Sequence, residues 1–501
     1  PRHTGDFAIA RAYLNGEPYK PEFFFPIAKE GVDAGDFVMI LGYPGVTYRS
    51  LIGDEMEERR DLFFPRREEV FGEQIRIIEE TTKGSPEGTI AMADHLKTLL
   101  NRYKNAQGQI AGFRRGRILE KQRTADDAVL AWAKGKSEHA AAVAAHQRLQ
   151  QLVREQRATW ERDFLLALIP IGVRSVPGAG ASLPKSLYYG VTLARTSRER
   201  QKPDAQRESS FGEKDLPRVR QRLESDQRAY FAPTDKAILL SWIRRARRLA
   251  PERRVATVDR IFGGISDEQL SAEIERMYAA TKVFDLQARW TMFSETPEQL
   301  RARKDPILDL GFTFDDELKA FDTLRQKGEG EIADTRPQWR RAVIAHAGKP
   351  VSPDANRTLR VSLAHVKGYE PRDAVIATPF TTIEGVIEKH TGEEPFDVPG
   401  FVLEAVRKDP APRSVPVNFL ADGDTTGGNS GSPVVNGRGE LVGVNFDRVW
   451  ENVANDFGYN PDIARNISAD MRYLLWILAQ TPGAEGLLRE IGAARVMEQK
   501  K

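Results

Sequence analysis

The chain has 501 residues, which corresponds to about two to four domains. Its 74 basic and 72 acidic side chains leave a formal net charge of +2, so composition gives no overall attraction to nucleic acids or membranes. The chain contains no cysteine, which excludes disulfides and thiol catalysis, and no apolar run approaches the roughly 20 residues of a transmembrane helix.

The first 60 residues carry short strand-like runs bounded by glycines. The clearest is Phe37–Leu41, which precedes the turn signal Gly42-Tyr43-Pro44-Gly45. Because Pro1 opens on what resembles the middle of a domain, we interpret residues 1–60 as the C-terminal part of a first β-barrel.

Residues 61–345 change to long, charged segments with helical periodicity, as in Gly88–Leu168. This pattern predicts a helical insertion, interrupted by a connector at Pro177–Ala181. The basic stretch Arg244–Arg248 has a single aromatic neighbour, Trp242, so we interpret it as a solvated helix face near acidic residues and not as a nucleic-acid site.

From residue 346 onward strands return, for example Leu359–Leu363, and the pattern ends in an amphipathic helix from about Asp470 to Ala479. Pro433–Val435 and Leu441–Val444 are β-branched runs joined by Asn436–Gly439, which is a strong hairpin signal. We expect residues 346–501 to form a second β-barrel with a C-terminal helix.

Directly before this hairpin, residues 427–433 read Gly-Gly-Asn-Ser-Gly-Ser-Pro. A serine on a tight glycine turn presents its hydroxyl while neighbouring N–H groups converge on one point, as acyl transfer requires. Ser430 is therefore the predicted nucleophile. The alternative is an ordinary turn between strands, because Gly and Asn adopt positive φ at low cost.

The segment Thr425–Pro433, with Asn445–Trp450 downstream, resembles the dipeptidyl-peptidase 7 and 11 family of serine exopeptidases from Gram-negative bacteria. Pro1–Ala8, Gly42–Arg49 and Tyr103–Asn105 resemble further motifs of this family. The resemblance implies an α+β protein with a chymotrypsin-like double β-barrel, the first barrel incomplete here, and a large inserted helical domain that covers the cleft.

The resemblance also assigns roles to residues. Asp6 would be the triad acid, and the N–H groups of Gly428 and Ser430 would hold the oxyanion. Asn105 would bind the free amine of the substrate. His3 is too close to Asp6 along an extended strand to be its partner, and no other histidine lies in a recognisable motif. We therefore expect the triad histidine upstream of Pro1.

Two residues compete to explain specificity. Asp424 lies where trypsin-like enzymes select basic side chains, whereas Arg448 lies where members of the resembled family that cleave after Asp or Glu carry arginine. In one pocket the two charges would pair and cancel. We assign Asp424 a structural role and Arg448 the pocket, with Phe446 as a wall, because a guanidinium fork matches a carboxylate. The alternative is Arg448 as a surface residue.

The implied activity is the release of N-terminal dipeptides, with Asp or Glu preferred as the second residue. Open alternatives are a dipeptidyl peptidase preferring apolar residues, an endopeptidase of the same fold, and an inactive peptide-binding protein. The resemblance further implies no metal or cofactor, peptide substrates with a free N-terminus, a homodimer, and a periplasmic or cell-surface location.

Overall fold

The computed structural model describes residues 7–169, 171 and 184–494 and divides into two compact units. The β-sheet unit comprises Pro1–Leu51, Gly108–Gln122 and Val351–Lys501, and the helical unit comprises Ile52–Gln107 and Arg123–Pro350. Asp6, His3 and the connector Pro177–Ala181 lie outside the described residues. In the described ranges no helix is both long and apolar enough to span a bilayer.

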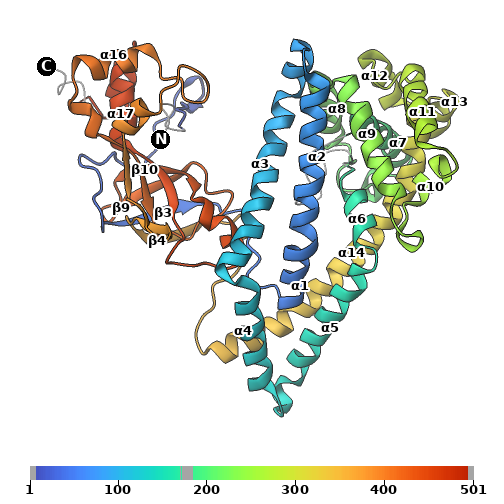
Figure 1. The fold of residues 1–501 in the computed structure, drawn as a ribbon, viewed down its shortest axis with the longest axis horizontal. Helices are drawn as coiled ribbons and strands as arrows, with labels where there is room; N and C mark the ends of the chain where they lie inside the picture. The colour runs from blue at the N-terminus through green and yellow to red at the C-terminus, as the bar shows by residue number, and fades with distance from the viewer. Residues whose placement is uncertain (1–6, 170, 172–183, 495–501) are drawn as a thin grey trace. The chain divides into compact units, whose positions relative to one another are not determined.

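The helical unit is built from α-helices of very different lengths (Figure 1). They are α1 (Gly53–Glu58), α2 (Phe64–Thr82), α3 (Pro86–Gly116), α4 (Ile118–Ala133), α5 (Ala140–Arg157), α6 (Trp160–Ala167), α7 (Lys185–Glu199), α8 (Leu216–Ser225), α9 (Ala232–Arg247), α10 (Ala256–Phe262), α11 (Asp267–Ala280), α12 (Leu286–Ser294), α13 (Pro297–Ala302) and α14 (Pro306–Ala347). Helical structure thus begins before the predicted residue 61.

The end of α3 and the start of α4 belong to the β-sheet unit, which the predicted boundaries did not include. The reason is close packing: a Cβ atom on Gly108 would lie 2.8 Å from Val453, and one on Gly112 would lie 2.4 Å from Ala454. These glycines let the helix approach residues 453–454 more closely than any larger side chain permits.

Helix α7 forms the centre of the helical unit, and nearly all of its residues are buried. It crosses α14 where two glycines face each other, because a Cβ on Gly190 would lie 2.5 Å from the carbonyl oxygen of Ile307 and one on Gly311 would lie 2.2 Å from the backbone of Gly190. The two backbones are therefore in direct contact. Such an approach increases dispersion contacts between neighbouring side chains.

A buried charge cluster joins the same two helices. Arg195 of α7 donates to Asp315 of α14 and, at 2.7 and 2.9 Å, to both oxygens of Glu208. Arg198 also donates to Asp315, whose side chain is fully buried. Opposite charges in this position offset one another's loss of hydration.

The basic stretch of α9 lies beside carboxylates, as expected. Arg245 pairs with Glu69 and Glu73 of α2, and Arg247 pairs with Asp267. Its charge is thus largely balanced within the helical unit.

The β-sheet unit contains a seven-stranded sheet in the order β4-β3-β9-β10-β11-β8-β7 (Figure 1). Its strands are β3 (Phe37–Gly42), β4 (Arg360–His365), β7 (Phe380–Thr382), β8 (Pro416–Ala421), β9 (Ser432–Asn436), β10 (Leu441–Arg448) and β11 (Asn466–Asp470). Outside it lie the pairs β1 (Tyr13–Leu14) with β2 (Glu17–Pro18), and β5 (Tyr369–Arg372) with β6 (Val375–Ala377). The predicted hairpin is confirmed as β9 and β10, and the predicted strand at Leu359–Leu363 as β4.

The assignment of Phe37–Leu41 to a separate first barrel needs correction. This segment is β3, which pairs with both β4 and β9 in the sheet that carries the serine turn. The sheet also closes on itself, because Val366 bridges to Ala421 and the N–H of Lys367 donates to the carbonyl of Leu420 at 3.0 Å. Pairing between residues more than 300 positions apart is not visible in a local pattern.

The unit also contains α15 (Ile383–Glu388), α16 (Gly400–Lys408), α17 (Met471–Gln480) and α18 (Glu485–Glu490). The predicted C-terminal helix is confirmed as α17. Asp470 caps it by accepting from the N–H of Arg472 at 2.8 Å, and Leu474, Leu475 and Ile477 pack into the core beside the sheet.

Candidate active site

The serine turn lies between the end of β8 and the start of β9. Its shape requires Gly428 and Gly431, whose φ angles are 110° and 87°. The N–H of Gly431 donates to the carbonyl of Asn445 at 2.8 Å, and the N–H of Ser432 donates to the carbonyl of Asn429 at 3.0 Å. Ser430 is exposed at the top of this turn.

Two backbone N–H groups of the turn take no part in its hydrogen bonds. The N–H groups of Asn429, Gly431 and Ser432 each donate to a carbonyl, but those of Gly428 and Ser430 have no acceptor within the described residues. Backbone N–H groups without an acceptor beside a serine hydroxyl are the donors that an oxyanion site requires. The turn therefore combines an exposed serine hydroxyl with two backbone N–H groups that have no acceptor within the described residues.

The Gly42–Gly45 element packs directly against the serine turn. The N–H of Gly45 donates to the carbonyl of Gly427 at 2.6 Å. A Cβ on Gly428 would lie 2.6 Å from the carbonyl oxygen of Tyr43, and one on Gly42 would lie 2.0 Å from Ser432 Oγ. Glycine is thus the residue that fits on both sides of the contact, and the element acts as a rigid support for the turn.

Three buried asparagines, one of them in the turn itself, are joined by hydrogen bonds. Asn429 accepts from the N–H of Thr426 at 3.0 Å, and Asn445 Nδ2 donates to the carbonyl of Asn429 at 3.0 Å. Asn466 Nδ2 donates in turn to Asn445 Oδ1 at 2.9 Å. A buried amide chain with its bonds satisfied fixes the backbone around it.

Ser430 Oγ donates to the carbonyl of Phe446 at 3.1 Å. Phe446 is the extra residue of a β-bulge, because Asn445 pairs with Ser468 whereas Asp447 pairs with Ile467. Bulges redirect the strand locally and are frequent beside active sites. No described histidine hydrogen-bonds to Ser430.

Arg448 ends β10 and forms an ion pair with Asp456. Its Nη1 donates to Asp456 Oδ1 at 2.8 Å and its Nη2 to Oδ2 at 3.2 Å, and each side chain is 13% exposed. Asp456 also accepts from Thr426 Oγ1 and, at 3.1 Å, from Gln109 Nε2. Sequence reasoning missed Asp456 and Gln109, because neither lies in a motif. Thr426 belongs to the segment Thr425–Pro433, but the sequence pattern indicated no role of its own for it.

Asp424 forms a different pair. Arg49 donates to both of its carboxylate oxygens, at 2.5 and 2.7 Å, and Asn455 Nδ2 donates to it at 2.8 Å. Burial alone would lower the pKa of Arg49, but the hydrogen bond and charge of Asp424 outweigh this effect and raise it. The negative charge of Asp424 is therefore balanced by its ion pair with Arg49.

Asn105 lies on α3 in the helical unit and is partly buried. It precedes Gln109 by four residues, so the two side chains share one face of this helix.

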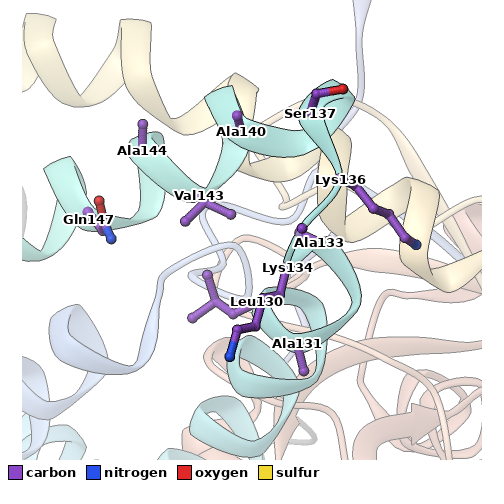
Figure 2. A pocket seen from close by; sticks show the side chains of 11 residues that line it. Leu130, Ala131, Ala133, Lys134, Lys136, Ser137, Ala140, Val143, Ala144 and Gln147 are labelled. Atoms are coloured by element: carbon purple, nitrogen blue, oxygen red, sulfur yellow. The ribbon is translucent and has the colours of Figure 1, made fainter.

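A pocket of about 700 Å³ lies elsewhere, between the end of α4 and the start of α5. Figure 2 shows Leu130 and Val143 facing each other across it. Its polar lining consists of two lysines, Ser137 and Gln147, and includes no histidine or carboxylate. The chemistry of the side chains therefore favours the serine turn over this pocket as the active site.

Comparisons of sequence and of structure with known proteins point to the same family of peptidases. A family model described as Peptidase S46 matches residues 1–493. An Asp/Glu-specific dipeptidyl-peptidase of Shewanella putrefaciens is 31% identical over 99% of this chain and 71% of its own length. The enzyme of the same name from Porphyromonas endodontalis is 31% identical over 98% of this chain and 69% of its own length. The crystal structure of P. endodontalis DPP11 in complex with the dipeptide Arg-Glu matches with a TM-score of 0.76 at 27% identity, covering 98% of this chain and 69% of that chain.

Proposed function

This chain belongs to the peptidase S46 family, and we propose that it is a serine exopeptidase that releases dipeptides from peptides with a free N-terminus, preferring Asp or Glu as the second residue. The observation that carries the proposal is a guanidinium, that of Arg448, on the strand whose carbonyl at Phe446 contacts the serine hydroxyl. The relatives named Asp/Glu-specific dipeptidyl-peptidase support it.

In the proposed reaction, Ser430 Oγ attacks the carbonyl carbon of the second substrate residue and loses its proton to a base. The resulting oxyanion accepts hydrogen bonds from the N–H groups of Gly428 and Ser430. Collapse of this intermediate breaks the peptide bond, and the base returns the proton to the leaving amine. Water then attacks the acyl-enzyme, which releases the dipeptide and restores the serine.

The base is proposed to be a histidine outside residues 1–501, oriented by Asp6. The support is chemical: Ser430 needs a proton acceptor, and the described histidines do not bond to it. We further propose the two-barrel arrangement of chymotrypsin-like enzymes, in which the first barrel carries this histidine and the second barrel carries the serine turn.

Specificity follows from the charges that remain after pairing. Arg49 and Asn455 occupy the carboxylate of Asp424, which leaves it poorly suited to select a lysine or arginine. Arg448 keeps N–H donors beyond those given to Asp456, and a carboxylate is the group that fits them. Phe446, on the same strand, would form a wall of the pocket.

Limitation to dipeptides requires recognition of the substrate's amine. We propose that Asn105 accepts a hydrogen bond from this ammonium group, since its amide oxygen is a suitable acceptor. A peptide with a blocked N-terminus would leave this acceptor and its surroundings unpaired.

The test uses the full-length protein and fluorogenic dipeptidyl amides whose second residue is Asp, Glu, Leu or Lys, with free or acetylated N-termini. We expect turnover of the free acidic substrates and a loss of several orders of magnitude in Ser430→Ala. Preference for Leu would favour the apolar-specific alternative, and equal cleavage of acetylated peptides would favour an endopeptidase. Binding without turnover would indicate an inactive peptide-binding protein.

We also propose a periplasmic or cell-surface location and a homodimer. Both rest on the resemblance to secreted exopeptidases, and the absence of cysteine is compatible with an oxidising compartment. Fractionation of the native host and sedimentation of the full-length protein would test them; a cytoplasmic enzyme or a monomer would contradict the respective proposal.

A further inference from the structure

Asp456 holds the Arg448 guanidinium at its outer end. Both contacts use the terminal nitrogens, Nη1 and Nη2, and each carboxylate oxygen accepts one of them. The Nε–H of Arg448 has no acceptor within the described residues. The edge formed by Nε and the second hydrogen of Nη2 therefore remains available for another carboxylate, because a guanidinium carries five N–H donors.

Asp456 is itself fixed from two further directions. Thr426, at the start of the serine turn, donates to Oδ1, and Gln109 of α3 donates to Oδ2 at 3.1 Å. The carboxylate thus receives donors from three separate segments, which sets its position without any contribution from a substrate.

We propose that Asp456 is a positioning residue for specificity: it holds the outer end of the Arg448 guanidinium and presents the Nε edge to the carboxylate of the second substrate residue. This inference rests on the proposed function, because it needs Arg448 to face that residue. It deepens that function by identifying what orients the arginine.

The physical reason is preorganisation. A free arginine side chain has many rotamers, and ordering it on substrate binding costs free energy that an existing ion pair has already offset. Charge alone predicts that Asp456 weakens the binding of acidic substrates, because its negative charge repels them. Removal of Asp456 therefore separates the two explanations: loss of orientation weakens selection of acids, whereas loss of repulsion strengthens it.

The test compares wild type, Asp456→Asn, Arg448→Gly and the double variant in the full-length protein, with dipeptidyl amides whose second residue is Asp, Glu or Leu. In Asp456→Asn we expect kcat/KM for the acidic substrates to fall about tenfold to a hundredfold, the effect of losing a charged hydrogen-bonding partner. The fall should appear largely in KM, with kcat/KM for the Leu substrate retained. Asp462→Asn, an exposed position in the loop that follows, serves as the charge-matched control and should behave as wild type.

In the Arg448→Gly background, Asp456→Asn should have no further effect on the Leu substrate, because Asp456 acts through Arg448. An equal fall for acidic and apolar substrates, or a further loss in the double variant, would show a merely structural role and overturn the inference. Unchanged or improved cleavage of acidic substrates would overturn it as well. If neither wild type nor Arg448→Gly prefers acidic substrates, the proposed function itself fails. If wild type and Asp456→Asn prefer acidic substrates equally while Arg448→Gly does not, the proposed function stands and only the role of Asp456 is lost.

Discussion

The hydroxyl of Ser430 donates to the carbonyl of Phe446, at the β-bulge of the strand that ends in Arg448. The nucleophile and the proposed selector of the substrate therefore belong to one locally fixed piece of backbone. A substrate residue held by Arg448 would have its carbonyl presented near Ser430 without adjustment of the strand. Positioning of this kind accounts for a large part of enzymatic rate enhancement.

Arg448→Gly should change substrate preference in the full-length enzyme. The substitution removes the cation and opens apolar volume, so kcat/KM for Asp or Glu substrates should fall by about 2 to 5 kcal/mol equivalent, and Leu, Met or Phe should be relatively favoured. Steady-state kinetics with both substrate classes measures the change. Arg438→Ala, on the exposed turn between β9 and β10, is the control; wild-type preference for Lys would instead direct attention to Asp424.

Asn105→Ala should impair cleavage of substrates with a free amine. An ammonium group that loses its acceptor costs about 1 to 3 kcal/mol, which corresponds to a clear decrease in kcat/KM. Asn101→Ala, an exposed position one turn earlier on α3, provides the matched control. Identical kinetics of Asn105→Ala and wild type would remove Asn105 from the amine site.

Gly428→Ala should inactivate the enzyme without unfolding it. The new Cβ would lie 2.6 Å from the Tyr43 carbonyl oxygen and 2.7 Å from the Gly45 nitrogen, so the turn must shift and take its N–H donor out of place. Loss of one oxyanion donor lowers kcat by about 10² to 10³. Gly427→Ala is the control, because its Cβ would meet no atom within 4 Å; equal kcat in both variants would argue against Gly428 as a donor.

The sequence predicts much of this site because its chemistry is local. The glycines around Ser430 and the hairpin that follows occupy one short segment, so their pattern reveals both turn and strands. The position of β3 was not predictable in this way, because its partners in β4 lie more than 300 residues away. The role of Asp456 was also not predictable from the sequence. Asp456 lies in a short helical turn, and its partners Thr426 and Gln109 come into contact with it only in the folded protein.

Asp315→Asn should destabilise the helical unit strongly. The substitution leaves Arg195, whose side chain is 1% exposed, without the charge of its buried partner. Breaking one side of a buried ion pair costs about 3 to 5 kcal/mol. Urea unfolding followed by far-ultraviolet circular dichroism measures the loss, with the exposed neighbour Asp316→Asn as control. Equal stability of the two variants would contradict the importance assigned to this cluster.

Glu73→Gln should alter stability in a pH-dependent manner. Burial alone would raise the pKa of Glu73, but hydrogen bonds from Ser241 and Arg245 outweigh it and lower the pKa below its ordinary value of 4.5. A carboxyl whose pKa is lowered by folding stabilises the protein above its unfolded pKa, and this contribution disappears as pH falls through the folded pKa. At pH 7 the variant should therefore unfold more easily, by about 1 kcal/mol after allowance for solvent screening.

The difference between wild type and Glu73→Gln should shrink as the pH falls from 4.5 through the lowered pKa of folded Glu73, where the carboxylate gains the proton that removes its charge. Glu79→Gln, an exposed position on the same helix α2, serves as the matched control. Urea unfolding at pH 7, 5 and 3 distinguishes the cases. A constant difference at all three pH values would mean that Glu73 contributes through packing or neutral hydrogen bonds, since only the charge of the carboxylate responds to protonation in this range.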